Sequence, residues 1–117
     1  MAYGDQMNAL IEFPADDPER ARRFWSQLLA VNLAERQPDD GQGWHADVAG
    51  VTLGIHRRGT GPGDRFSLPY FPVTDMRDAL ARVTELGGEV VHPGERWAVC
   101  RDSEGTPFAL ACTAPPP

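Results

Sequence analysis

The stretch that decides the fold is EFPADDPERA (residues 12–21), which returns in related form as YFPVTDMRDA (residues 70–79). Phe, Pro, Asp and Ala recur at matching positions of the two copies, 58 residues apart. Twice this offset is nearly the whole chain of 117 residues. Because a unit of this size cannot bury its own apolar face, the repeat predicts two copies of one supersecondary unit that pack together.

Each copy joins a strand to a helix. Residues 7–13 alternate in character as a strand does, and Pro14 is expected to end that strand. Asp17 can cap a helix that we predict from about Asp17 to Ala30. In the second copy, the strand is predicted over residues 65–73. Asp75 caps the helix that follows, and this helix ends at Gly87-Gly88.

The rest of each half reads as three further strands. They are predicted at residues 31–36, 43–48 and 51–57 in the first half, and at 89–91, 96–101 and 107–112 in the second. A Gly-rich segment between the halves is predicted to be a flexible linker. We therefore predict one α+β domain over residues 1–117, with a first module at about 7–57, a linker at 58–64 and a second module at about 65–113.

One face of each strong strand is apolar and suited to pack against a helix, whereas the other face is mixed. The mixed face carries Leu10, Glu12, Gly54, His56, Leu68, Tyr70, Ala109 and Ala111. Apolar walls with a few polar groups are typical of a ligand pocket. The pattern therefore favours two mixed sheets that form an open cup, with the helices outside.

Composition limits the partners and the location. The net charge of −6, with all cations arginine and scattered, argues against nucleic-acid binding. No apolar run approaches a membrane span, and no secretory signal is visible, so a cytoplasmic protein is expected. Cys100 and Cys112 lack metal-site spacing and are expected to be free thiols.

The paired βαβββ order resembles the vicinal oxygen chelate superfamily, which includes glyoxalase I, extradiol dioxygenases, fosfomycin-resistance enzymes and bleomycin-resistance proteins. The resemblance spans about residues 7–113. It rests on the F-P-x-x-D junction that begins at Phe13, on Phe24-Trp25 in the first helix, and on DSEGTPF at residues 102–108. By resemblance, a homodimer with a small-molecule ligand is expected.

Enzymes of this superfamily commonly hold a divalent metal in the cup, through His or Glu on the first and last strands of each module. Carried over to this chain, the four ligand positions are Leu10, Gly54, Leu68 and Ala109. None of these side chains has an oxygen or nitrogen donor, and divalent metals need several. We therefore expect no metal and no other cofactor, and a metal-dependent glyoxalase or dioxygenase-like enzyme remains only if this register is wrong.

Polar groups are predicted one tier further along the same face. In this family the first and last strands of a module are adjacent and parallel, so Glu12 and His56 should be neighbours. A carboxylate beside an imidazole is the arrangement of a general base. Tyr70 could donate to a carbonyl or an oxyanion. These three are the candidate catalytic residues. The candidate ligand-binding residues are Leu10, Glu12, Trp44, His56, Leu68, Tyr70, Trp97 and Ala109.

Three functions remain open from the sequence. The first, which we favour, is a metal-free binding protein of the glyoxalase/bleomycin-resistance type that holds a small planar or amphipathic molecule in the cup. The second is a metal-free lyase, isomerase or cyclase that uses Glu12 and His56 as an acid–base pair. The third is an interaction subunit whose cup is filled by its own side chains.

Overall fold

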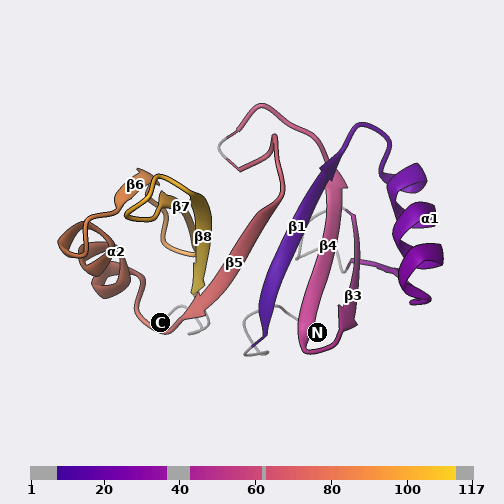
Figure 1. The fold of residues 1–117 in the computed structure, drawn as a ribbon, viewed down its shortest axis with the longest axis horizontal. Helices are drawn as coiled ribbons and strands as arrows, with labels where there is room; N and C mark the ends of the chain where they lie inside the picture. The colour runs from indigo at the N-terminus through magenta and orange to yellow at the C-terminus, as the bar shows by residue number, and fades with distance from the viewer. Residues whose placement is uncertain (1–7, 37–42, 62, 113–117) are drawn as a thin grey trace.

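The structure, a computed structural model, describes residues 8–36, 43–61 and 63–112, and within them the chain forms the βαβββ unit twice (Figure 1). The first module comprises β1 (Ala9–Ala15), α1 (Pro18–Leu29), β2 (Ala34–Glu35), β3 (Trp44–Val48) and β4 (Val51–Arg57). The second comprises β5 (Leu68–Val73), α2 (Met76–Glu85), β6 (Glu89–His92), β7 (Trp97–Arg101) and β8 (Pro107–Cys112). The predicted α+β class and the repeat are confirmed. Residues 7 and 113, the predicted outer limits of the modules, lie outside the described residues.

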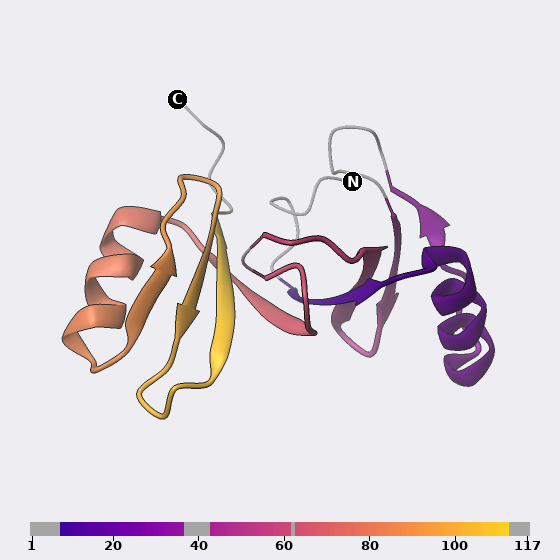
Figure 2. The same cartoon turned by 90° about the horizontal axis from the view of Figure 1, so that it is seen from above.

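The strands of both modules join in one open sheet, in the order β2-β3-β4-β1-β5-β8-β7-β6. Within each module the first and last strands are parallel neighbours, β1 with β4 and β5 with β8. The modules meet where β1 pairs with β5 in antiparallel orientation. The two helices lie at opposite ends of the molecule, each against its own half of the sheet (Figures 1 and 2).

Both helices begin where the repeat predicts. Asp17 is extended and its side chain accepts a hydrogen bond from the Arg20 backbone N–H at 3.1 Å. Asp75 does the same for the backbone N–H of Asp78 at 3.0 Å. Each cap satisfies a backbone donor that the first helical turn would leave unpaired. Neither helix in the described part of the chain is long and apolar enough to cross a membrane.

The strand ends differ from the sequence prediction at several places; β2, for example, covers only Ala34–Glu35 of the predicted residues 31–36. β1 continues past Pro14 to Ala15, because pairing with β5 covers only Leu10–Glu12 and leaves that edge of β1 open where the proline lacks its N–H. β5 begins at Leu68 rather than at residue 65. Residues 65–67 instead continue the irregular path of the predicted linker, in which the Gly59 N–H donates to the carbonyl of Asp64.

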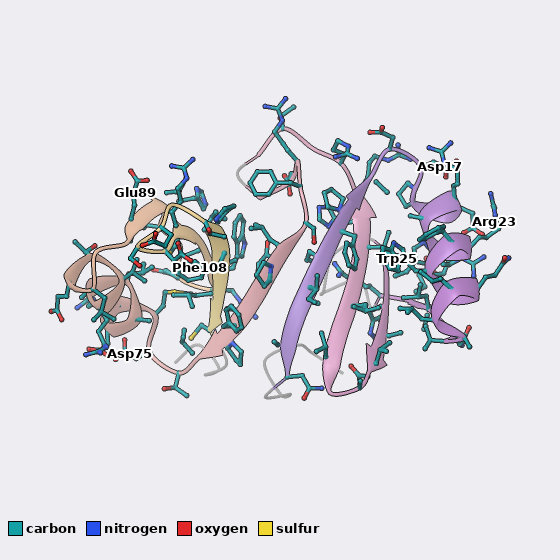
Figure 3. All side chains as sticks on the ribbon, in the orientation of Figure 1. Asp17, Arg23, Trp25, Asp75, Glu89 and Phe108 are labelled. Atoms are coloured by element: carbon teal, nitrogen blue, oxygen red, sulfur yellow. The ribbon has the colours of Figure 1, made fainter. Side chains whose placement is uncertain are left out.

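Two clusters of apolar side chains lie between the sheet and the helices. In the first module, Trp25 of α1 points toward the sheet and packs with Phe13 and the fully buried Ile55 (Figure 3). In the second module, the cluster includes Cys100 and Leu110. Since side chains alternate along a strand, the neighbours of these residues occupy the opposite sheet face, which we call the cup face.

Burial makes the two thiols unequal. Cys100 is fully buried, which raises the pKa of its thiol, whereas Cys112 is half-buried. A raised pKa leaves less of the reactive thiolate at a given pH. At pH 8 we expect iodoacetamide to alkylate Cys112 well before Cys100 in the folded protein, as measured by peptide mass spectrometry. Protein unfolded in guanidinium is the control, in which both should react alike; equal rates in the folded protein would contradict the assignment.

Candidate functional site on the cup face

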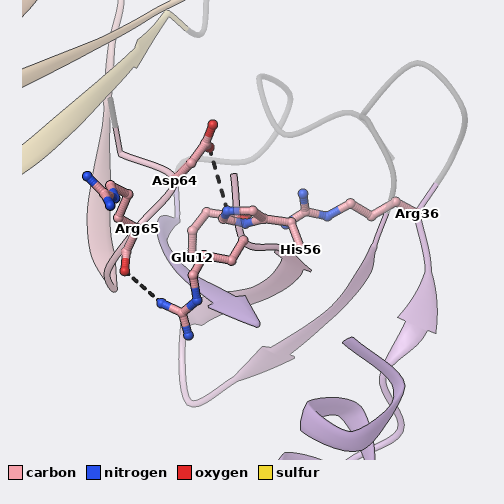
Figure 4. A network of polar contacts seen from close by, with 6 residues as sticks. Glu12, Arg36, His56, Asp64 and Arg65 are labelled. Carbon is pink, nitrogen blue, oxygen red and sulfur yellow. Dashed lines mark hydrogen bonds and ion pairs between the residues drawn. The ribbon is translucent and has the colours of Figure 1, made fainter. Parts of the chain in front are cut away.

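The cup face of the first module holds a chain of polar contacts that starts from Glu12 on β1. This residue is only 5% exposed. Its carboxylate accepts a hydrogen bond from Arg36, and its Oε1 lies 2.7 Å from Nδ1 of His56 on β4 (Figure 4). The predicted proximity of Glu12 and His56 is thus present, because β1 and β4 run parallel side by side.

Arg36 supplies the charge that a buried carboxylate requires. It directly follows β2, where its backbone N–H donates to the carbonyl of Gly43 at 2.9 Å. Its side chain is 13% exposed and that of Glu12 is 7% exposed, so the ion pair is largely shielded from water. A buried charge without such a partner would carry a large desolvation cost.

Gly54 makes room for this ion pair. It lies opposite Glu12 in the register of β1 and β4, on the same cup face. A Cβ atom at Gly54 would approach Arg36 Nη2 and Glu12 Oε2 well inside the 3.0 Å that real Cβ atoms keep. The glycine therefore allows the guanidinium to lie directly over β4.

The two nitrogens of His56 have different surroundings. Nδ1 faces a carboxylate that is paired with Arg36 and can only accept, so Nδ1 carries a proton. Nε2 is buried and has no hydrogen-bond partner among the described residues; the carboxylate of Asp64 lies 3.7 Å away as a longer ion-pair contact (Figure 4). In the neutral ring, Nε2 is an acceptor turned toward a second acceptor. A group with two hydrogens to donate, placed between these two acceptors, would satisfy both.

Asp64 reaches this position because the linker is folded. The Gly59 N–H donates to the carbonyl of Asp64 at 3.2 Å, and the Asp64 N–H donates to the carbonyl of Gly61 at 3.1 Å. Arg58 also donates to the carbonyl of Arg65 at 2.8 Å. The segment that we predicted to be a flexible spacer thus places a carboxylate beside the predicted site.

The cup face of the second module is apolar. Leu68 and Ala109 are fully buried and cluster with Val99 and Tyr70. The linker contributes to covering them, since a Cβ on Gly63 would lie 2.9 Å from Leu68 Cδ1. Beside the linker is a cavity of about 210 Å³, which Phe66 and Val99 help to line.

The prediction that Glu12, His56 and Tyr70 share one tier is wrong for Tyr70. The pairing of β1 with β5 is antiparallel, so Glu12 lies opposite Leu68, and Tyr70 lies opposite Leu10. Two strands that run in opposite directions carry equivalent positions away from each other. Tyr70 therefore stands one row from the Glu12–His56 contact, level with Ala109.

The two tryptophans predicted to bind the ligand lie in different parts of the structure. Trp44 packs in the core cluster on the helix side, with Arg22 4.9 Å above its ring. Trp97 lies opposite Ala111 at the outer part of the cup face, 41% exposed and stacked on His92 at 5.0 Å. Among the described residues, neither tryptophan takes part in the chain of polar contacts that starts from Glu12.

The side chains do not fit the metal that the superfamily resemblance implies. Leu10, Gly54, Leu68 and Ala109 offer no donor, and the space above Gly54 is taken by the guanidinium of Arg36. Across the described ranges, no three His, Cys, Asp or Glu side chains are arranged to hold a metal ion.

Sequence reasoning missed Arg36 and Asp64. A buried Glu12 requires a cation, so the existence of a partner could have been inferred. Its identity could not, because every cation in the chain is an arginine. Asp64 had no signal at all, since a Gly-rich segment predicts a spacer and not a folded turn.

The comparisons with known proteins agree with this architecture. The sequence profile of a family described as a glyoxalase-like domain matches residues 10–111. No curated protein matches the chain.

Three solved structures illustrate the shared fold. An NAD-dependent benzaldehyde dehydrogenase from Legionella pneumophila has a TM-score of 0.71 at 15% identity, over 89% of this chain and 97% of that one. The hypothetical protein BH1468 from Bacillus halodurans C-125 has 0.66 at 12%, over 94% and 96%. A glyoxalase/bleomycin resistance protein/dioxygenase superfamily member from Vibrio splendidus 12B01 has 0.57 at 16%, over 89% and 96%. Identities this low establish likeness of fold alone.

Proposed function

The chain belongs to the glyoxalase-like domain family, and on that premise we propose that it is a metal-free protein that binds a small planar or amphipathic molecule on its cup face. The observation that carries the proposal is the buried Nε2 of His56, which has no hydrogen-bond partner among the described residues. Pockets combine apolar walls with a few oriented polar groups. Here Glu12 orients His56, while Leu10 and Tyr70 supply apolar surface in the adjacent row.

The four ligand positions of the superfamily carry no metal donor here, and the surroundings of Gly54 also favour a site without a metal. The guanidinium of Arg36 brings a permanent positive charge to the cup face above Gly54. Arginine keeps this charge at any working pH and presents several N–H donors. The ligand would then be held by hydrogen bonds and apolar contact.

The proposal includes a homodimer in the cytoplasm. Phe24 and Leu28 on α1 are 58% and 61% exposed, and α1 has no fully buried residue. The sheet also ends in two outer strands, β2 and β6, whose edges a second copy could cover. Light scattering of the purified chain measures its oligomeric state directly.

Binding can be tested with 2-naphthol, a planar amphipathic molecule with an O–H donor. In EDTA-treated protein we expect it to shift the ring nitrogen signals of His56 in ¹⁵N NMR spectra. The substitution His56→Phe should weaken binding about tenfold, because one hydrogen bond contributes about 1 to 1.5 kcal/mol.

His92→Phe is the matched control, because it makes the same change while keeping the ring stack on Trp97. Its affinity should equal that of the wild type. Binding that needs an added divalent metal, or that is unchanged in His56→Phe, would refute the proposed site.

A second candidate is a metal-free lyase, isomerase or cyclase, favoured by the 2.7 Å contact between Glu12 and His56. His56 would act as the general base, with its ring oriented by Glu12, and Tyr70 would donate a hydrogen bond to an oxyanion. Mass spectrometry of a bound ligand after incubation separates the two functions. Turnover that Glu12→Gln abolishes while binding survives, and that the exposed control Glu85→Gln leaves intact, would favour the enzyme.

A further inference from the structure

The two modules fill the space between helix and sheet differently, although they repeat one sequence unit. In the first module, Trp25 of α1 stacks on Phe13 with ring centroids 4.7 Å apart. It belongs to the cluster that contains Ala15, Ala21 and Ile55. The indole thus occupies the space between the helix and the first and last strands of its module.

The second module has a smaller side chain at the same repeat position. Counting 58 residues on, Trp25 becomes Val83, and its neighbours Ala15 and Ala21 become Val73 and Ala79. Ile55 corresponds to Leu110, since each pairs with the repeated phenylalanine of the adjacent strand.

The four counterparts of Trp25 and its neighbours line a cavity of about 660 Å³ between α2 and the strands β5 and β8: Val73, Ala79, Val83 and Leu110. This volume lies within the range of about 300 to 1,000 Å³ that small-molecule pockets have. Helix α2 is anchored beside the cavity, because Met76 belongs to a buried cluster with Ala98, Cys100 and Leu110. Ala79, Leu80 and Val83 pack against this cluster, so the cavity opens alongside these contacts. The space is therefore bounded by a packed helix and a sheet.

The rim of this cavity is more acidic than basic. Asp75, Asp78 and Asp102 line it together with Arg82 and Arg101. The charge of Arg101 is countered by Glu89 at 2.9 Å. Among the described residues, the side chain of Asp78 has no ion pair or hydrogen bond, so it is available to a ligand. A cation is the complementary charge.

We propose that this outer cavity is a second ligand site, which takes a planar aromatic amine. The ring would lie on Val83 and Leu110, where the first module places an indole, and the ammonium group would face Asp78 at the rim. The site is on the sheet face opposite the cup, so it stands or falls independently of the function proposed above.

The test uses three indoles that differ in charge: tryptamine, indole and indole-3-acetate. Titrated into the ¹⁵N-labelled full chain, tryptamine should shift the backbone amide signals of residues 73–88 and 101–110 and leave those of Glu12 and His56 in place. We expect indole-3-acetate to bind at least tenfold more weakly than tryptamine, and Asp78→Asn to weaken tryptamine a few-fold.

The substitution Val83→Trp should fill the cavity as Trp25 fills the first module, and so weaken tryptamine at least tenfold without lowering the melting temperature. Thr84→Trp is the matched control, because it adds the same ring at the next, exposed position of α2. If Val83→Trp does not fold, Ala79→Leu narrows the same cavity. Unchanged affinity in a folded filling variant, or equal affinity for the cationic and anionic probes, would overturn the proposal.

Discussion

Replacing Arg36 with alanine is expected to lower the free energy of unfolding by about 3 to 5 kcal/mol. The substitution leaves the carboxylate of Glu12, 5% exposed, without its cation. His56 remains as a hydrogen-bond partner at 2.7 Å, but it does not replace the permanent charge of the guanidinium. Urea denaturation followed by circular dichroism measures the change.

Arg23→Ala is the control, because it removes an arginine, 56% exposed, from an ion pair with Glu19 on the surface of α1. That pair is solvated, so its loss should leave stability nearly unchanged. The double variant Glu12→Gln with Arg36→Met should recover much of the loss, since it removes both charges and keeps the side-chain volumes. A cost for Arg36→Ala below about 1 kcal/mol would show that Glu12 does not depend on this pair.

Much of the fold was predictable because the helix caps and strand patterns that determine it involve only a few consecutive residues and occur in both modules. Asp17 and Asp75 can cap helices from the sequence alone, since the capping bond spans only three residues. The strands predicted at residues 43–48 and 51–57 leave only Ala49-Gly50 for the turn between them, and both residues have positive φ. The end of β1 was not, because whether Pro14 interrupts a strand depends on which edge is paired, and that is a property of the assembled sheet.

The candidate site was predictable only in part, for the same reason. The Glu12–His56 contact follows from parallel neighbours within one module. The position of Tyr70 depends on how the two modules meet, and their antiparallel junction moved it by one row. Arg36 and Asp64 come from segments without a strong pattern, so only the three-dimensional structure could select them.

Gly54→Ala is the second substitution with a large expected effect, a loss of about 1 to 3 kcal/mol in the free energy of unfolding. The residue lies inside β4 and is not among the glycines with positive φ. On backbone grounds alone, alanine would therefore stabilise the protein by about 0.4 to 1 kcal/mol, through the unfolded chain. The opposite sign is expected because the new methyl group would overlap the ends of the Arg36 and Glu12 side chains, which burial and their ion pair keep from moving aside. The measured sign decides between the two effects.

A double-mutant cycle tests whether the cost of Gly54→Ala comes from the ion pair. In an Arg36→Ala background one of the two overlapping groups is gone, so the added methyl group should cost less than it does in the wild type. Residues in direct contact show coupling energies of about 0.5 to 3 kcal/mol. Additive costs would mean that the glycine and the guanidinium act independently. Coupling would mean that Gly54 on β4 and the buried Arg36 depend on each other, because the guanidinium occupies the space that a side chain at position 54 would fill.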